Sequence, residues 1–254
     1  MRKGKIIVAS MMLFCVLCFA VVALYFLVLK SDDGQSADQP HAAAILQVAG
    51  LVRANKPDPE TIKTLFARRV IVRQVNLDSG ELLPVAAHQD AQKTCVTLAA
   101  DQDPAQIRQR CSIADIYFIQ NNEHEIQQVI LPVSGKGAKS MMHAFLALES
   151  DGRTVKNLLY YDQDETPGLG AKVDDADWLR QWPGKKVLDD RAQPALKVVQ
   201  QNSGNSDNYT VDGITGATMT SVGVEKSINF WTGDRAYGHF LQRLMKDKQI
   251  LSNQ

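Results

Sequence analysis

Residues 212–221, Asp-Gly-Ile-Thr-Gly-Ala-Thr-Met-Thr-Ser, place small residues and hydroxyls directly before an apolar-periodic run. That run predicts a helix beginning at about Thr220, and it consists of Val222, Val224, Ile228, Phe230 and Trp231. A helix start offers free backbone N–H groups and the positive end of the helix dipole, so it suits a phosphate. The hydroxyls within reach of such a phosphate are those of Thr215, Thr218, Thr220 and Ser221. The same composition also suits an ordinary helix cap, and spacing alone leaves both interpretations open.

A second segment with potential chemistry is Glu165-Thr166-Pro167-Gly168-Leu169-Gly170. It follows a predicted strand over Val155–Tyr161 and combines a rigid proline turn with two glycines. Such a backbone can approach a flat ligand closely, because glycine has no Cβ and tolerates unusual torsion angles. A plain surface loop has the same composition, so the hexapeptide alone does not decide.

The elements that must position these segments mix strands and helices. The expected strands cover Val70–Leu77, two runs within Ile113–Pro132, Met141–Leu148, Val155–Tyr161, Leu196–Gln200 and Tyr209–Val211. The expected helices cover 42–51, about 58–67, where Asp58 caps and Pro59 opens the helix, and Asp174–Trp182, and two more begin near Thr220 and Asp234. The strands form hairpins rather than alternating strictly with helices along the chain. This arrangement predicts an α+β domain.

The N-terminal region predicts an uncleaved membrane anchor. Ile6–Leu29 is apolar apart from Ser10 and is long enough to cross a bilayer core. Basic residues precede it, so the positive-inside rule puts the N-terminus in the cytoplasm and the remaining chain across the membrane. We therefore expect a cytoplasmic tip and transmembrane helix over 1–30, a polar linker over 31–40, and one periplasmic domain over 41–254.

Composition excludes some partners and leaves one question open. The 254 residues carry 28 basic and 28 acidic side chains, so nothing suggests a nucleic-acid surface. Cys95 and Cys111 are the cysteines outside the anchor, and sequence cannot decide between a disulfide and two free thiols. No metal site is expected from them, and the histidines, His41, His88, His124, His143 and His239, have no convincing catalytic partners.

Taken together, the two motifs resemble those of FMN-binding domains in membrane redox complexes. The sequence Asp-x-x-Thr-Gly-Ala-Thr resembles the flavinylation motif, and the nearest resemblance is to the family of the C subunit of the Na⁺-translocating NADH:quinone reductase. The likeness extends over nearly the whole chain, including 45–51, 75–81, 135–137, 145–148 and 182–186. The G subunit of the RNF electron-transfer complex shares both motifs and is the alternative. One departure is Ala138-Lys139, where the family usually has a bulky apolar pair.

The resemblance implies that Thr218 carries FMN as a phosphoester, with Gly216 and Ala217 clearing space and Thr215 nearby. Asp212 then serves recognition by a flavin transferase, although a simple turn residue is an equal interpretation. The loop expected to lie against the isoalloxazine ring comprises Glu165, Thr166, Gly168, Leu169 and Gly170. No acid–base catalyst is required. Lys172, just past the loop, either stabilises reduced flavin or is a solvated lysine.

The function that follows from the resemblance is electron relay within a sodium-exporting complex of the bacterial inner membrane. Neighbouring subunits would supply and accept the electrons, and the absence of a nicotinamide-binding fingerprint puts the NADH site on another subunit. Two interpretations from other classes remain. One is a membrane-anchored binding module without redox function, in which Thr218 only caps a helix. The other is a periplasmic FMN-dependent reductase that acts alone.

Overall fold

The computed structural model describes residues 41–53, 58–84, 94–200, 207–247 and 249–252. The predicted membrane segment 6–29 and the linker 31–40 lie outside these ranges. Within the described ranges, no helix is both long and apolar enough to cross a bilayer.

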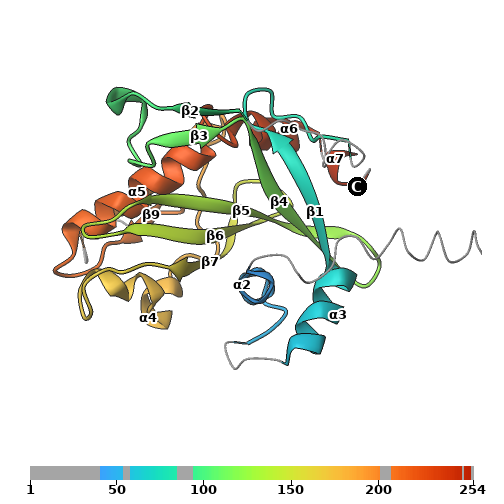
Figure 1. Cartoon of the computed structure of the whole chain (residues 1–254), viewed down its shortest axis with the longest axis horizontal. Coiled ribbons are helices and arrows are strands. Elements are labelled where there is room, and N and C mark those ends of the chain that lie inside the picture. The colour runs from blue at the N-terminus through green and yellow to red at the C-terminus, as the bar shows by residue number, and fades with distance from the viewer. Residues whose placement is uncertain (1–40, 54–57, 85–93, 201–206, 248, 253–254) are drawn as a thin grey trace, which may run out of the picture.

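The centre of the domain is a five-stranded antiparallel sheet with the order β1-β4-β5-β6-β7 (Figure 1). Its strands are β1 (Val70–Asn76), β4 (Ile113–Gln120), β5 (Ile126–Lys136), β6 (Met141–Glu149) and β7 (Val155–Asp162). The predicted hairpin of β6 and β7 is confirmed, as are the two strands on either side of Asn121–His124.

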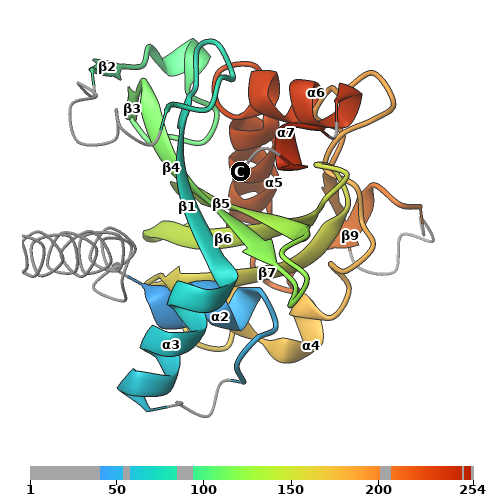
Figure 2. The same cartoon turned by 90° about the vertical axis from the view of Figure 1, so that its right-hand side faces the viewer.

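Helices cover both faces of the sheet (Figure 2). On one face lie α2 (Ala42–Val48) and α3 (Pro59–Arg69), and on the other lie α5 (Thr218–Thr232) and α6 (Gly238–Lys246). The start predicted for α3 is confirmed, because the Asp58 side chain accepts a hydrogen bond from Thr61 N at 2.9 Å. The described part of the chain is thus an α+β domain, as predicted, and its sheet lies between two helical layers.

The strands are apolar on both sides because each side packs against a helical layer. Phe118 contacts the core cluster under α5 and α6, whereas its neighbours Tyr117 and Ile119 belong to the cluster under α2 and α3. Alternate residues of a strand point to opposite faces, so a sheet buried on both sides needs nearly continuous apolar runs. This explains why β4 and β6 show little polar alternation in the sequence.

Strands β4 and β5 separate at one end of the sheet. Their pairing begins only at Tyr117 and Ile130, although β5 continues to Lys136. Side chains from the C-terminal part of the chain complete the exposed edge of β5: Tyr237 Oη donates to Pro132 O at 3.1 Å, and Trp231 Nε1 donates to Ser134 O at 2.7 Å. The residues that line this opening therefore come from both sheet halves and from α5.

A second, small sheet was not predicted from the sequence. It pairs β2 (Cys95–Thr97) with β3 (Gln109–Cys111), and a disulfide joins Cys95 to Cys111. The disulfide answers the question that the sequence left open. The strands escaped prediction because they are three residues each and largely exposed, so neither carries an apolar alternation.

The remaining elements lead to and from α5. The two predicted short strands are confirmed as β8 (Lys197–Val199) and β9 (Thr210–Asp212), which pair in parallel. The expected helix 174–182 is shorter, as α4 (Ala176–Leu179) after a 3-10 helix over Gly170–Asp174.

The C-terminal helices differ from prediction at their ends. Helix α5 begins at Thr218 rather than about Thr220, because Ser221 N already donates to Ala217 O at 3.0 Å. Helix α6 begins at Gly238 rather than about Asp234, and a short α7 (Gln249–Ser252) follows that was not predicted. The apolar run indicated that the helices exist, but backbone hydrogen bonds set their first residues.

Candidate functional site

The segment that enters α5 is held by side chains from α4 and the turn after it. Gln181 bonds the backbone of Asp212 in both directions: its Oε1 accepts from Asp212 N at 2.7 Å and its Nε2 donates to Asp212 O at 3.1 Å. Trp178 Nε1 donates to the same carbonyl at 2.8 Å. The end of β9 is therefore fixed through its backbone, and the Asp212 carboxylate does not take part in these bonds.

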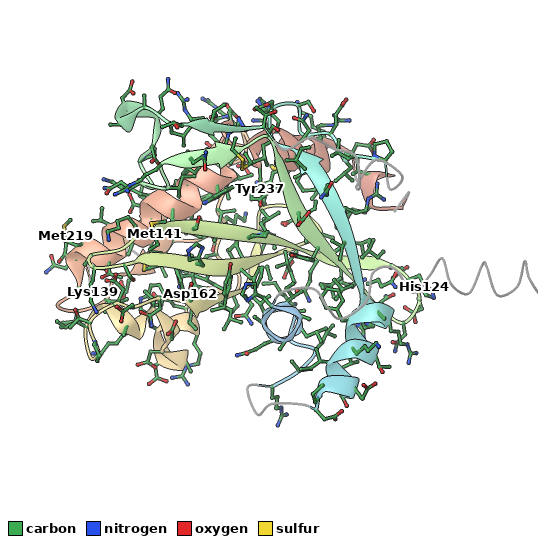
Figure 3. The ribbon with its side chains drawn as sticks, in the orientation of Figure 1. His124, Lys139, Met141, Asp162, Met219 and Tyr237 are labelled. Atoms are coloured by element: carbon green, nitrogen blue, oxygen red, sulfur yellow. A yellow bond between two sulfur atoms is a disulfide. The ribbon has the colours of Figure 1, made fainter. Side chains whose placement is uncertain are left out.

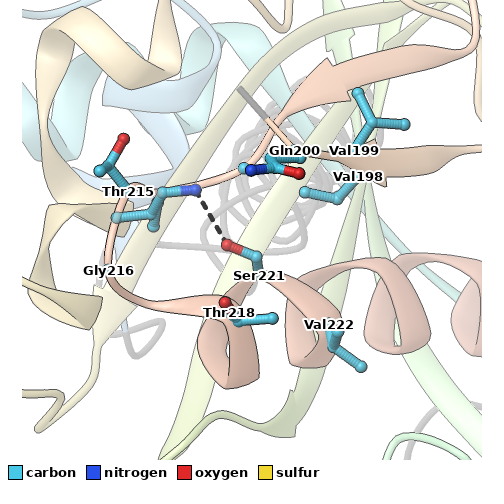
Figure 4. A pocket seen from close by; sticks show the side chains of 10 residues that line it. Val198, Val199, Gln200, Thr215, Gly216, Thr218, Ser221 and Val222 are labelled. Carbon is cyan, nitrogen blue, oxygen red and sulfur yellow. Dashed lines mark hydrogen bonds between the residues drawn. The ribbon is translucent and has the colours of Figure 1, made fainter. Parts of the chain in front are cut away.

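Ser221 closes the loop between β9 and α5. Its Oγ accepts a hydrogen bond from Ile214 N at 2.9 Å (Figure 4). The same Oγ donates one to Ala217 O at 3.0 Å. Gly216 has φ of +76°, a left-handed conformation that favours glycine, and it makes the turn immediately before the helix. The glycine and the serine of the motif thus have local structural roles.

The four hydroxyls of the motif separate into two kinds. Thr220 is only 1% exposed and donates to Glu165 Oε2 at 2.7 Å, and Ser221 is occupied as described. Thr215 and Thr218 are exposed. No hydrogen bond from the Thr218 hydroxyl to another described residue is found. Of these two exposed threonines, only Thr218 belongs to the first turn of α5.

The first turn of α5 also leaves backbone donors open. The residue before the helix is Ala217, whose methyl side chain cannot cap the helix by a hydrogen bond. The first turn of α5 contains no acidic residue. Ser221 N donates to Ala217 O and so makes the first hydrogen bond of the helical ladder, which leaves the N–H groups of Thr218, Met219 and Thr220 before it. With the positive end of the dipole, these N–H groups favour an anion beside Thr218.

A cavity of about 510 Å³ adjoins Thr218 (Figure 4). It lies between β8, the turn before α5 and the first turns of α5, and its lining residues are Val198, Val199, Gln200, Gly213, Ile214, Thr215, Gly216, Thr218, Ser221 and Val222. Its volume is within the range of small-molecule sites. An adjoining cavity of about 370 Å³ is lined by Asp212 and Lys172, and Gly213, Ile214 and Thr215 line both.

Glu165 does not line either cavity. The residue is 3% exposed, and its carboxylate accepts hydrogen bonds from the backbone N–H groups of Ala138, Lys139 and Ser140 at 2.8–3.1 Å. The hydroxyls of Ser140 and Thr220 donate to it as well. Burial raises the pKa of the Glu165 carboxyl, but the hydrogen bonds outweigh burial and lower this pKa to about 2. We refer to Glu165, its three backbone donors and Thr220 as the Glu165 cluster.

Glycines allow the parts of the Glu165 cluster to meet. A Cβ at Gly137 would lie 2.5 Å from Glu165 Oε1, and a Cβ at Gly170 would lie 2.5 Å from Thr220 Oγ1. Gly223 likewise lets α5 pack on the β5–β6 turn, because a Cβ there would lie 2.3 Å from Lys136 O. The departure at Ala138-Lys139 is accommodated, since these two residues contribute backbone N–H groups.

The remainder of the predicted ring-binding loop is a surface turn. Thr166 O accepts hydrogen bonds from Leu169 N at 3.1 Å and from Ala171 N at 3.2 Å, and Gly168 has φ of +76°. The Leu169 side chain extends to the other motif, since a Cβ added at Gly216 would lie 3.0 Å from Leu169 Cδ2. The structure therefore brings the loop and the threonine motif together at Leu169 and Gly216.

Exposed apolar side chains gather around Thr218. Among the described residues the large exposed ones are Val96, Leu169, Met219 and Val222, with exposed fractions of 49%, 43%, 67% and 39%. Three of the four adjoin the site, and we refer to Thr218, Leu169, Met219 and Val222 as the Thr218 surface. Figure 3 shows Met219 and Lys139 at the same end of the molecule. A cluster of exposed apolar side chains is typical of a binding surface.

Sequence reasoning missed Met219 and Val222 as site residues. Val222 was counted within the apolar run of the helix, yet it is exposed and lines the cavity. The signal was available, because residues four apart share a helix face and Val222 lies four residues after Thr218. The buried face of α5 instead carries Thr220, Val224 and Ile228.

The described residues hold no group of three or more His, Cys, Asp or Glu side chains arranged to bind a metal ion. Two of the histidines make ring contacts. The His41 ring lies 4.4 Å from that of Tyr161, and the His143 ring lies 6.2 Å from it. These contacts are on the α2 side of the sheet, away from the threonine motif.

The model of the FMN-binding domain family matches residues 137–233. This range runs from the β5–β6 turn to the end of α5 and contains both the Glu165 cluster and the Thr218 surface. The residues that the structure brings together around Thr218 thus fall within the matched domain.

Relatives match almost the entire chain. The C subunit of the Na⁺-translocating NADH-quinone reductase from Yersinia pestis is 38% identical over 249 residues, which is 95% of this chain and 92% of that protein. The protein of the same name from Vibrio alginolyticus is 37% identical over 235 residues, 89% of this chain and 90% of that one.

Solved structures agree with the fold. The crystal structure of Shewanella oneidensis NqrC has a TM-score of 0.71 and 29% sequence identity, and the match covers 81% of this chain and 96% of that one. The similarity therefore extends well beyond the range of the family model.

Proposed function

The chain belongs to the family of the C subunit of the Na⁺-translocating NADH-quinone reductase, and on this premise we propose that it is the FMN-carrying electron-relay subunit of such a complex. It passes electrons between redox centres of neighbouring subunits and so contributes to sodium export. Bound FMN supplies the electron-transfer chemistry, and the protein supplies binding, orientation and electrostatics. The identity along nearly the whole chain favours this family over the RNF alternative.

Covalent attachment of FMN to Thr218 through a phosphoester is the finer part of the proposal. Its main support is the contrast among the hydroxyls on the helix, where Thr220 and Ser221 are bonded within the protein and Thr218 is exposed beside a cavity. The open N–H groups of the first turn of α5 suit a phosphate at this position. The side chains present therefore fit the phosphate end of FMN.

The flat end of FMN has apolar neighbours available. Leu169, Met219 and Val222 are exposed near Thr218, and burying apolar surface against a ring stabilises its binding. Thr166, Gly168 and Gly170 shape the turn that presents Leu169. Glu165 acts indirectly, since its carboxylate is occupied within the Glu165 cluster and holds the loop against α5.

The residues before Thr218 suit access by a flavin transferase. Gly216 and Ala217 have no bulky side chains, and Thr215 lines the same cavity. Asp212 lines the adjoining cavity, where an external enzyme can reach it. We assign recognition by the transferase to Asp212, with its backbone held by Gln181.

The proposed topology has residues 6–29 in the inner membrane, the N-terminus in the cytoplasm and the domain 41–254 in the periplasm. The Cys95–Cys111 disulfide supports this, because disulfides persist in oxidising compartments such as the periplasm and are rare in the cytosol. The apolar segment and its basic flank provide the remaining support.

Flavin fluorescence of the denatured chain tests the proposal. We expect fluorescence to survive denaturing electrophoresis of the native chain and of Thr215→Ala, which removes the other exposed hydroxyl. Thr218→Ala should lose it completely. Retention in Thr218→Ala would show that the bond lies elsewhere, and its absence from the native chain expressed with a flavin transferase would favour a binding module without redox function.

A reductase acting alone is separated from the relay by purification. The relay should co-purify from membranes with integral redox subunits. A flavin-loaded chain that is recovered without them and reduces soluble acceptors would support the reductase instead.

A further inference from the structure

A second cavity, of about 600 Å³, lies where β4 and β5 separate. None of its lining residues lines the cavity beside Thr218. Its walls come from residues 106–111, the start of β4, the end of β5, the start of β6 and Trp231 of α5. Met141 marks one wall in Figure 3. We refer to this cavity as the basic groove.

The charged side chains of the basic groove have one sign. Arg108, Arg110 and Lys136 line it together with His143, and no lining residue is acidic. This is uneven for a chain with equal numbers of acidic and basic residues. Arg110 is paired with Asp78 outside the lining. Lys136 Nζ donates a hydrogen bond to Lys139 O at 2.6 Å, so its charge is not neutralised by a carboxylate. For Arg108 no ion pair is found within the described ranges, so its charge is available to a partner.

The backbone that carries these basic side chains is constrained. Asp103 is buried, and its carboxylate accepts hydrogen bonds from Ile107 N at 2.9 Å and Arg108 N at 2.6 Å. Gln106 and Arg108 have φ of +55° and +65°, a conformation that costs energy for residues with a Cβ. Arg110 lies on β3, and the Cys95–Cys111 disulfide joins this strand covalently to β2.

The rest of the basic groove suits a polypeptide better than an enclosed small molecule. Its apolar part is formed by Leu77, Ile113, Met141 and Trp231. A small-molecule site normally has a few unpaired polar groups directed into it. Of the buried side-chain polar atoms without a partner among the described residues, none belongs to the groove. Gln106, Arg108 and Gln109 are instead exposed at its rim.

The basic groove also lies near the point where the described domain begins. The His143 ring, which lines the groove, is 6.2 Å from the Tyr161 ring, and Tyr161 contacts His41 at 4.4 Å. His41 is the first described residue and follows the linker from the proposed anchor. If the domain is tethered there, this side of the sheet is close to the membrane subunits.

From the single-sign lining, the constrained loop and this location, we propose that the basic groove binds an acidic polypeptide segment of another subunit of the redox complex. The inference rests on the proposed function for the existence of that complex. Aspartate and glutamate side chains of the segment pair with Arg108 and Lys136, and apolar side chains between them contact Met141 and Trp231. Charge complementarity of this kind sets orientation and partner choice more than total affinity.

Charge reversal tests the proposal in the full-length chain. Arg108→Glu combined with Lys136→Glu is compared with Lys63→Glu combined with Arg68→Glu, which makes the same charge change on the exposed surface of α3. We expect at least a tenfold loss of co-purifying subunits from membranes for the groove variant and little change for the α3 variant. Arg108→Glu alone, which leaves the β5–β6 turn intact, should give a smaller loss in the same direction.

Flavin content separates failure of this inference from failure of the proposed function. Arg108→Glu alone and the α3 variant should retain covalent flavin at the native level, because Arg108 belongs neither to the Thr218 surface nor to the Glu165 cluster. Native recovery of the other subunits by the groove variant would overturn the docking proposal and leave the flavin proposal intact. Native chain without flavin would overturn the proposed function.

A photoreactive residue identifies the occupant directly. Placed at Gln109 on the rim of the groove, it should cross-link to an aspartate- and glutamate-rich peptide of another subunit, and the yield should fall in high salt. Placed at Lys63, it should not yield that product. Cross-linking at Gln109 to lipid, to a basic peptide or to nothing would contradict the proposal.

Discussion

The Glu165 cluster and the Thr218 surface meet α5 two residues apart, at Thr220 and Thr218, and they differ in burial and in hydrogen bonding. In the cluster, a buried carboxylate has five donors, and three glycines leave room for close packing. On the surface, a hydroxyl, backbone N–H groups and apolar side chains are exposed. The comparison teaches that one short motif contains both the residues that fix a site and the residue that is free to react.

Removing the Glu165 carboxylate should have the largest effect on stability. Glu165→Ala leaves the buried Thr220 hydroxyl and several part-buried backbone N–H groups without an acceptor, and we expect the free energy of unfolding to fall by about 3 kcal/mol. Denaturant titration measures this, with Glu60→Ala on α3 as the exposed control, expected within about 0.5 kcal/mol of native. An equally small effect of both changes would mean that the cluster does not hold the loop.

Two threonines on one helix give the sharpest form of the comparison. Thr220→Val keeps the shape of the side chain but removes a donor to Glu165, which should cost about 1–2 kcal/mol of unfolding free energy. Thr218→Val should cost less than about 0.5 kcal/mol, because its side chain is exposed, and should abolish covalent flavin. Loss of flavin in Thr220→Val with native stability would reverse the roles we assign.

The pH dependence of stability should carry a contribution from Glu165. Its pKa is lowered to about 2 in the folded chain from an ordinary value of 4.5, so the stabilisation is complete above about pH 4.5. It is lost progressively as pH falls from about 4.5 towards 2. Unfolding of Glu165→Gln measured over this range should depend less steeply on pH than unfolding of the native chain. Parallel curves for the two would contradict the assignment.

The smallest effect on stability is expected at the Thr218 surface. Leu169→Ser should change the unfolding free energy by less than about 0.5 kcal/mol but shift the midpoint potential and fluorescence yield of the attached flavin, because a polar side chain replaces an apolar neighbour. Val96→Ser, at a similarly exposed position away from the site, is the matched control. An identical midpoint potential and fluorescence yield in both variants would show that Leu169 does not contact the flavin ring.

Much of the fold could be predicted from local sequence. The capped start of α3 at Asp58, the β6–β7 hairpin and the helix after the threonine motif all follow from patterns within a few residues. The placement of Leu169 beside Gly216 agrees with the expectation that the two motifs meet.

What could not be predicted depends on contacts between distant segments. Glu165 was expected against a ring, but its partners lie 25–27 residues before it and 55 residues after it, and no local pattern reports such burial. Where β4 and β5 separate, Trp231 and Tyr237 donate to carbonyls of β5 that lie 97 and 105 residues earlier in the chain. Val222 was counted only in the apolar run that predicts the helix, because the apolar period does not distinguish a binding face from a buried one.

The mass of the chain, purified from its native host and fully unfolded, tests the central claim most directly. We predict the mass of the polypeptide plus one FMN less one water, with the added mass on the single peptide that contains Thr218 and on that residue. An unmodified mass, or flavin on a peptide without Thr218, would contradict the account.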